Sequence, residues 1–204
     1  MGTDIQNQNQ QNQGECWNLE SALDVLIVLL YSKGPEGSTG EPIEGITRLD
    51  KIMYLLSKSP EFQGVVNKGY QFEADNFGPF APELFDDVEA LKQENIIAVT
   101  SSRDTKTKIE TIDEEYVETE AADRASDEGI TSWATYPVER YELTEEGKRI
   151  GSLLFNCLSE QQKIQLKNVK SIFGGMKLSA LLHYVYTKYP ELTDKSKIRN
   201  RVLH

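Results

Sequence analysis

Residues 45–94 read GITRLDKIMYLLSKSPEFQGVVNKGYQFEADNFGPFAPELFDDVEALKQE, and this stretch predicts the fold. Apolar side chains recur with helical spacing over Thr47–Ser57, which predicts an amphipathic helix. Thr47 precedes the apolar run and Asp50 follows three residues later, a weak form of the capping box that favours a helix start here. A short strand signal around Tyr70–Phe72 comes next.

The second half of the same stretch predicts a turn and another helix. Phe77-Gly78-Pro79 punctuates the chain, and Pro82 suits the first turn of a helix that runs to about Glu94. That helix would bury Leu84, Val88 and Leu91. A β-branched strand, Ile96–Thr100, follows it. Helix, turn, helix and strand in this order predict a winged-helix core in an α+β, mostly helical fold.

The chain upstream of this core divides into a tail, a helix and a linker. Residues 1–17 include the tract Gln6–Gln13, made only of glutamine and asparagine, and predict a disordered tail. Leu19–Tyr31, with Asn18 as N-cap, predicts a helix that is apolar on all sides. Such a helix is either buried between layers or docked on another subunit, so a homodimer is one alternative. We interpret the glycine-rich stretch Ser32–Pro42 as a linker, because it lacks the Gly-Lys-Ser/Thr ending of a phosphate-binding loop.

A long acidic insertion separates the two predicted strands of the wing. The strands are Ile96–Thr100 and Tyr136–Leu143, and the insertion covers residues 101–135. It holds ten Asp or Glu against four Lys or Arg, a net charge of −6. We interpret it as a solvated loop; the alternative is an acidic surface for a basic partner, or a partial mimic of nucleic-acid charge. The winged-helix domain would then span residues 18–143.

The rest of the chain predicts a C-terminal helical extension, residues 144–204, packed on this core. Thr144 can cap a first helix, and Ser159 with Gln162 forms a capping box for a second. Apolar side chains with helical spacing over Leu178–Tyr189 predict a third.

Charge divides unevenly between these parts and limits the partners that the protein can bind. The formal net charge is −11, which argues against indiscriminate attraction to nucleic acid or to an anionic membrane. The helix Pro82–Glu94 would occupy the recognition-helix position, yet it carries five acidic side chains on its solvent side against Lys92 alone. Like charges would repel it from the phosphates of a duplex. A candidate acidic partner surface comprises Glu83, Asp86, Asp87, Glu114, Glu115 and Glu118.

The C-terminal part has the opposite charge. From Ser159 to His204 there are nine Lys or Arg against three Asp or Glu. We interpret this as solvated charge that balances the acidic insertion, and the alternative is a small phosphate-binding surface. The candidate phosphate contacts are Lys167, Lys170, Lys177, Lys195, Lys197, Arg199 and Arg201.

No sequence motif predicts catalysis, a cofactor or a metal. Cys16 and Cys157 belong to no CxxC pair, which favours a reducing cytoplasm over a disulfide framework. The chain has no GxSxG elbow, HExxH helix, Walker loop or Rossmann fingerprint. No apolar run approaches the roughly 18 residues that a membrane span needs. We therefore predict a cytoplasmic protein with no catalytic residues, and an enzyme with a dispersed site stays as an alternative.

Four segments resemble a known family. Gly45–Leu56 and Phe72–Phe80 are similar to the TRLxKLxFLL-type helix and YGPFS-type turn of the YwgA-like group of uncharacterised bacterial and archaeal proteins. Tyr141–Gly147 resembles its YxLTxxG junction, and Leu181–Glu191 resembles its LLxYVYxxYPE helix. The resemblance covers 45–198 without the acidic insertion. More remotely, the helix and its Gly-Pro turn resemble the Panacea-domain antitoxins, whose pattern is KLxKLxYY followed by YGP.

This resemblance implies a winged-helix core and names no catalytic residue. The Panacea likeness implies a protein-binding antitoxin or adaptor. We interpret the shared residues as structural: the two basic ones would pair with acids of the helix Pro82–Glu94, and the Gly-Pro pair would form the turn. Phe77 replaces the tyrosine of both patterns, and the acidic insertion also departs from them. The shared positions are Thr47, Arg48, Lys51, Phe77, Gly78 and Pro79.

Together these observations predict a non-catalytic regulatory or accessory protein of the antitoxin or adaptor type. It would act through a protein partner, which a basic surface would suit. The first alternative is a transcriptional regulator that contacts DNA phosphates through the basic C-terminal region.

Overall fold

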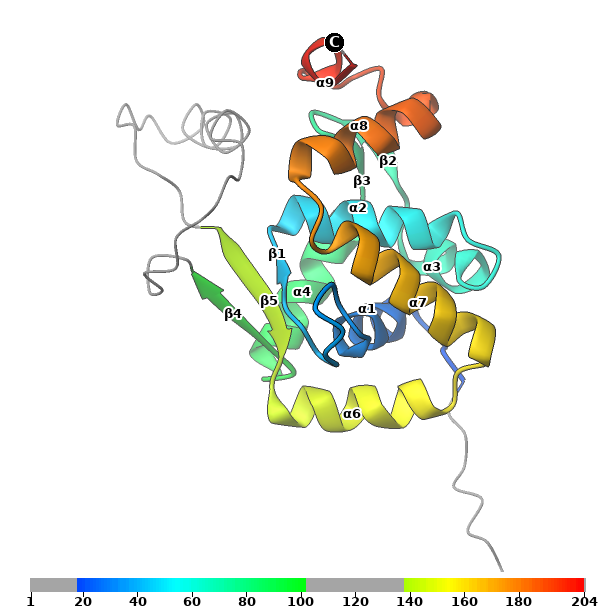
Figure 1. The fold of residues 1–204 in the computed structure, drawn as a ribbon, viewed down its shortest axis with the longest axis vertical. Helices are drawn as coiled ribbons and strands as arrows, with labels where there is room; N and C mark the ends of the chain where they lie inside the picture. Colours follow the sequence, from blue (N-terminus) through cyan, green and yellow to red (C-terminus); the bar gives the residue numbers. More distant parts are fainter. Residues whose placement is uncertain (1–17, 102–137, 204) are drawn as a thin grey trace, which may run out of the picture.

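The computed structural model describes residues 18–101 and 138–203, which form an α+β, mostly helical fold with two small antiparallel sheets (Figure 1). This confirms the α+β, mostly helical part of the predicted fold class. The tail 1–17 and almost all of the insertion 101–135, with Glu114, Glu115 and Glu118, lie outside the described residues. The helices are α1 (Ala22–Tyr31), α2 (Ile46–Ser57), α3 (Gln63–Gly69), α4 (Pro82–Gln93), α6 (Glu145–Asn156), α7 (Glu160–Phe173), α8 (Leu178–Lys188) and α9 (Arg199–Leu203). The strands are β1 (Ile43–Glu44), β2 (Glu73–Asp75), β3 (Gly78–Phe80), β4 (Ile97–Ser101) and β5 (Glu139–Leu143).

The strands form two separate sheets. The three-stranded sheet has the order β1-β5-β4, so that Tyr141 of β5 is opposite Ile43 on one side and Val99 on the other. Strands β2 and β3 form a separate hairpin, in which Asp75 is opposite Gly78. Residues 58–81 between α2 and α4 therefore contain a helix, α3, and a hairpin. The sequence analysis missed α3 and placed the first hairpin strand three residues too early.

Helix α1 is buried within this one chain. Every side chain from Val25 to Leu30 is at most 4% exposed, because α3, α6 and α7 surround the helix together with β5. Of the two predictions for an all-round apolar helix, burial between layers is thus confirmed. The N-cap is Ser21, which forms a capping box with Asp24, so the prediction of Asn18 as the cap is wrong.

Helix α2 is the centre of the fold and contacts β1, α3, β3, α7 and α8. Only Thr47 is more than about a tenth exposed among its residues. The helix begins at Ile46, and Gly45, with a φ of 82°, is the N-cap without any side-chain hydrogen bond. The predicted capping role of Thr47 and Asp50 is therefore wrong. Asp50 lies four residues after Ile46 and three before Met53, which puts it on the buried side of the helix.

The structure confirms the sequence signals that predicted the starts of α4, α6 and α7. Pro82 is in the first turn of α4, which buries Leu84, Val88 and Leu91. The Thr144 hydroxyl accepts a hydrogen bond from the Gly147 N–H (3.1 Å), and Ser159 forms its capping box with Gln162. In the C-terminal part, α6 packs on α1, whereas α7 and α8 pack on α2 (Figure 1).

The start of α6 is where this packing leaves least room. A Cβ on Gly147 would overlap the carbonyl oxygen of Ile96, which is backbone and cannot rotate away. We predict that Gly147→Ala lowers the free energy of unfolding by about 1–3 kcal/mol in urea titrations. The matched control is Gly64→Ala in α3, where a Cβ would meet nothing within 4 Å. The free energy of unfolding of that variant should rise by up to about 1 kcal/mol. Equal decreases in both variants would contradict the close approach of α6 to Ile96.

Candidate functional site

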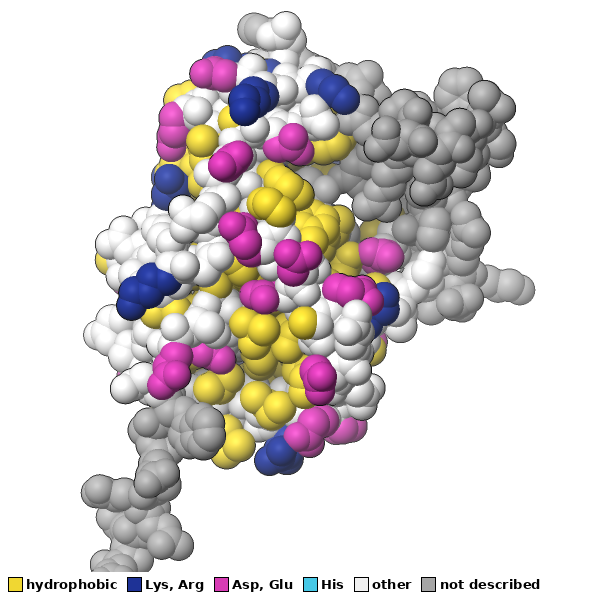
Figure 2. All heavy atoms as spheres, turned by 180° about the vertical axis from the view of Figure 1, so that it is seen from behind, with side chains coloured by type: hydrophobic (Ala, Val, Ile, Leu, Met, Phe, Trp, Pro, Cys, Tyr) yellow, Lys and Arg dark blue, Asp and Glu magenta, His cyan; other side chains and the backbone are white. Residues whose placement is uncertain are grey.

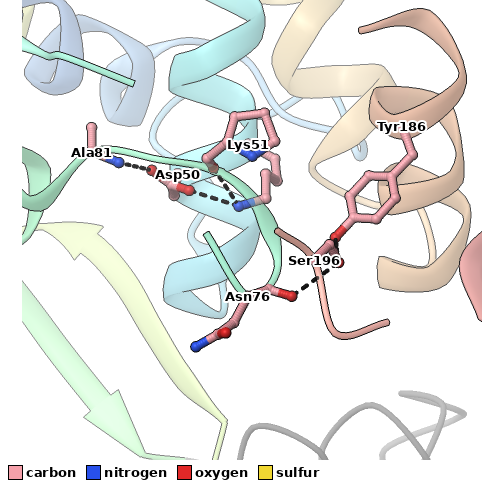
Figure 3. Close-up of polar contacts among 7 residues, drawn as sticks. Asp50, Lys51, Asn76, Ala81, Tyr186 and Ser196 are labelled. Atoms are coloured by element: carbon pink, nitrogen blue, oxygen red, sulfur yellow. Dashed lines mark hydrogen bonds and ion pairs between the residues drawn. The ribbon is translucent and has the colours of Figure 1, made fainter. Parts of the chain in front are cut away.

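A buried ion pair joins α2 to the β2–β3 hairpin. Asp50 is 1% exposed and Lys51 is 2% exposed. The Lys51 Nζ donates to Asp50 Oδ2 (2.8 Å) and to the carbonyl oxygen of Pro79 (2.6 Å). The Ala81 N–H donates to Asp50 Oδ1 (3.3 Å). Both charged groups are therefore satisfied by each other and by the backbone that follows the hairpin turn (Figure 3).

The electrostatics of this pair depend on its burial. Desolvation raises the pKa of the Asp50 carboxyl, the Lys51 ammonium opposes the rise, and the negative charge of Asp75 adds to it. Removing two charges from water costs several kcal/mol per ion, which close contact and backbone hydrogen bonds offset. Losing either partner would leave an uncompensated charge in the core.

The other side of the hairpin turn is attached to the C-terminal segment. Gly78 has a φ of 83°, and a Cβ there would come within 2.7 Å of the Tyr186 ring. The hydroxyls of Tyr186 and Ser196 are hydrogen-bonded (2.8 Å), and Ser196 also donates to the carbonyl oxygen of Asn76 (3.0 Å; Figure 3). The Lys197 N–H donates to the same oxygen (3.1 Å). The predicted Gly-Pro turn is thus held between α2 and the chain around α8.

A pocket of about 120 Å³ opens beside the ion pair, between α2, the hairpin and α4. Ligand pockets for drug-sized molecules and cofactors span roughly 300–1,000 Å³, so this one suits a single side chain or a few waters. Three phenylalanine rings form apolar parts of its wall. The ring centroids of Phe80 and Phe85 are 5.0 Å apart. The lining residues are Ile46, Thr47, Asp50, Lys51, Asp75, Phe77, Phe80 and Phe85.

The pocket contains part of the predicted motif and several residues that sequence reasoning missed. Thr47, Lys51 and Phe77 line it, next to the Gly78-Pro79 turn. Asp75, Phe80 and Phe85 were not singled out, because they come from separate elements that only the fold brings together. Asp50 carried a usable signal, since a carboxylate at an apolar position of a helix must find a buried partner.

The predicted ion pairs between α2 and α4 are wrong. The Arg48 Nε donates to the carbonyl oxygen of Glu44 (2.9 Å), and its Nη1 donates to those of Phe173 (3.1 Å) and Met176. Arg48 therefore satisfies the carbonyl groups where α7 ends. Burial lowers the pKa of its guanidinium. Lys51 likewise bonds to Asp50 and Pro79 and not to α4.

The candidate phosphate contacts differ widely in exposure. Lys170 is fully buried, and its Nζ donates to the carbonyl oxygens of Leu30 (2.6 Å) and Ser32 (3.0 Å), so its prediction as a phosphate contact is wrong. Arg199 forms an ion pair with Asp194 (2.6 Å). The Arg201 side chain is outside the described part of the structure. The exposed candidates are Lys167, Lys177, Lys195 and Lys197.

The acidic face of α4 is partly engaged. The Tyr70 hydroxyl donates to Asp87 Oδ2 (2.8 Å), and burial raises the pKa of that carboxyl. Glu83 is half-buried and Asp86 is exposed. These two side chains remain as the accessible part of the predicted surface within the described residues.

Two further findings concern residues 18–101 and 138–203 only. In those ranges no three His, Cys, Asp or Glu side chains gather as metal ligands. The helices there are too short or too polar to cross a membrane.

Comparison with known proteins returns no match among family models, curated sequences or solved structures. The resemblance to the YwgA-like and Panacea-domain proteins therefore stays a prediction.

We predict that Lys51→Met lowers the free energy of unfolding by about 3–5 kcal/mol, because it leaves the Asp50 carboxylate buried without its cation. The double variant Asp50→Asn/Lys51→Met should recover part of this loss. Urea titrations at neutral pH measure both, with Lys68→Met on the exposed side of α3 as the control, expected within about 0.5 kcal/mol of wild type. If the loss of unfolding free energy in the double variant equals the sum of the losses in the two single variants, the two side chains are not coupled.

Burial lowers the pKa of the Lys170 ammonium to about 7 in the folded protein. In the unfolded chain the same group has its ordinary pKa of about 10.5. Between these values the unfolded state binds more protons, so the free energy of unfolding rises with pH. We predict that wild type gains stability relative to Lys170→Met above pH 7, by at most about 1.4 kcal/mol per pH unit. Lys167→Met, on the exposed side of α7, should show no such trend. If the difference in unfolding free energy between wild type and Lys170→Met stays constant or falls as the pH rises, the pKa of Lys170 is not lowered by burial.

Proposed function

We propose that the described chain has a winged-helix core. The element order α1, β1, α2, α4, β4, β5 supports this, because a winged helix places one strand after its first helix and two wing strands after its third. The sheet order β1-β5-β4 also fits, since the early strand pairs with the last strand of the wing. Residues 138–143 would then return from the wing into α6.

Two features of this scaffold argue against ordinary reading of a DNA groove by α4. A helix-turn-helix joins its two helices through about 3–4 residues. Here residues 58–81 intervene, and the hairpin they contain lies against α2 and α8. In addition, Glu83 and Asp86 give α4 a negative face that phosphates would repel.

We infer that the protein is a non-catalytic regulatory or accessory protein, of the antitoxin or adaptor type, that acts by binding another protein. The observation that carries this inference is the aromatic pocket, which lies beside the acidic helix α4. Seen from the side opposite α6 and α7, hydrophobic side chains lie among Asp and Glu in the middle of the face, and Lys and Arg lie mostly toward its edges (Figure 2). Apolar groups surrounded by charged ones are typical of a protein-binding surface.

The buried ion pair beside the pocket fits a structural role better than a catalytic one. Lys51 is held by Asp50 and by the Pro79 carbonyl, so its ammonium is already paired. A general base or nucleophile needs a free lone pair facing the substrate.

A homodimer is a further proposal that the exposed apolar side chains favour. Leu153 on α6 is 58% exposed, and Ile164 and Ile172 on α7 are 56% and 54% exposed. Neither helix contributes a residue to the lining of the pocket.

The alternative is a DNA-binding regulator, and the exposed lysines Lys195 and Lys197 favour it. They lie between α8 and α9. Without Lys170, and with Arg199 paired to Asp194, fewer cations remain for phosphates than the sequence predicted.

The test pairs two charge variants of the full chain. Affinity-tagged protein is recovered from the cells that encode it, as wild type, as Glu83→Lys/Asp86→Lys and as Lys195→Glu/Lys197→Glu. We expect a protein partner in near-equal molar amount with wild type and with the lysine variant, and its loss with the acidic variant. The purified chain should not bind a generic duplex at about 50 mM salt.

Binding of the duplex that weakens steeply with salt, and that is lost in Lys195→Glu/Lys197→Glu, would contradict a protein partner as the main ligand. Each phosphate contact would add about 0.9 to the slope of log K against log salt, so the slope counts the contacts.

A further inference from the structure

We propose that the pocket between α2, the β2–β3 hairpin and α4 binds an arginine side chain of a partner protein. This inference rests on the proposed protein-binding function and specifies the chemistry of its contact. It follows from three properties of the pocket: its aromatic walls, its unpaired carboxylate and its size.

The walls of the pocket are formed partly by three phenylalanine rings. Phe77 comes from the hairpin turn, Phe80 from β3 and Phe85 from α4, and all three are partly exposed. Phe80 and Phe85 are tilted by 49° at a centroid distance of 5.0 Å, so they form a corner. A cation within about 6 Å of an aromatic ring is attracted by the negative charge of the ring face.

Asp75 supplies the charge. It is partly exposed and lines the pocket, and within the described part of the chain its carboxylate has no hydrogen-bond donor and no cation as partner. The other two charged lining groups, Asp50 and Lys51, neutralise each other. The pocket therefore has a formal charge of −1, and Glu83 and Asp86 on either side of Phe85 in α4 extend the negative field.

The pocket is close to the size of one side chain, and its chemistry favours arginine over lysine. A volume of about 120 Å³ excludes a nucleotide or other cofactor. A guanidinium is planar and weakly hydrated, stacks on aromatic faces, and can bond both oxygens of one carboxylate. An ammonium loses more hydration on entering an aromatic site. A phosphate would meet the carboxylate of Asp75 with the same sign of charge.

Nuclear magnetic resonance of the ¹⁵N-labelled full chain tests this with small probes. The probes are the N-acetyl, N′-methylamide derivatives of arginine, lysine and norleucine, added at equal ionic strength. We expect saturable shifts of the Thr47, Asp75 and Phe77 amides with the arginine probe, weaker binding of lysine and weaker still of norleucine. Norleucine has no charge, so it isolates the apolar contribution.

Two variants locate the contact. Asp75→Asn should weaken binding of the arginine probe by at least about tenfold, because it removes a charge-assisted hydrogen bond. Glu160→Gln is the matched control, an exposed carboxylate at the start of α7 that does not line the pocket, and it should change binding less than twofold. Phe77→Leu keeps the wall apolar without a ring, and should also weaken the arginine probe while leaving norleucine unchanged.

Three results would overturn the proposal: norleucine or lysine binding as tightly as arginine, an Asp75→Asn variant that binds like wild type, or no saturable shift with any probe. The capture experiment separates this inference from the proposed function. A partner recovered equally by wild type and by Asp75→Asn would overturn the arginine pocket and leave protein binding intact. Arginine-specific shifts without any recovered partner would contradict the proposed function and leave the specificity of the pocket intact.

Discussion

The contact of Lys51 with Asp50 and with the Pro79 carbonyl is the constraint on which the rest of the site depends. It joins the β2–β3 hairpin to α2 through the carbonyl oxygen of Pro79 in β3. With the hairpin in place, Phe77 and Phe80 line the pocket together with Phe85 of α4. Because the ion pair is buried and satisfied, the charge of the pocket depends on Asp75 alone.

Basic side chains are used in the same way elsewhere in the core. Arg48 satisfies carbonyl groups around the end of α7, and Lys170 satisfies those where α1 ends. Backbone carbonyls at buried helix ends need donors, and a long basic side chain can reach several of them. The consequence is electrostatic: the positive charges of Arg48 and Lys170 are buried in the core, whereas the charge of Lys51 is balanced by the equally buried Asp50. The burial of these cations agrees with the proposal of a basic protein partner rather than a nucleic acid.

Local signals in the sequence were enough to predict most of the helices and several of their ends. The capping box at Ser159, the Thr144 cap and Pro82 at the start of α4 each act within one turn of chain, so their effect is readable from spacing. The distant partners of Arg48, Lys51 and Lys170 could not be predicted, since these partners lie 28 to 140 residues away and depend on tertiary packing. The pocket was missed for the same reason. Helix α3 was missed because a helix of seven residues with two glycines, two valines and an asparagine has little propensity of its own.

Hydrogen–deuterium exchange of wild type and Lys51→Met, in native conditions, tests the central claim most directly. If Lys51 holds the hairpin, the amides of β2 and β3 should exchange much faster in the variant, while those of α1 remain protected up to the global unfolding free energy. Equal exchange of the hairpin in both proteins would show that it is held by other contacts. In that case the ion pair would not be what positions the pocket.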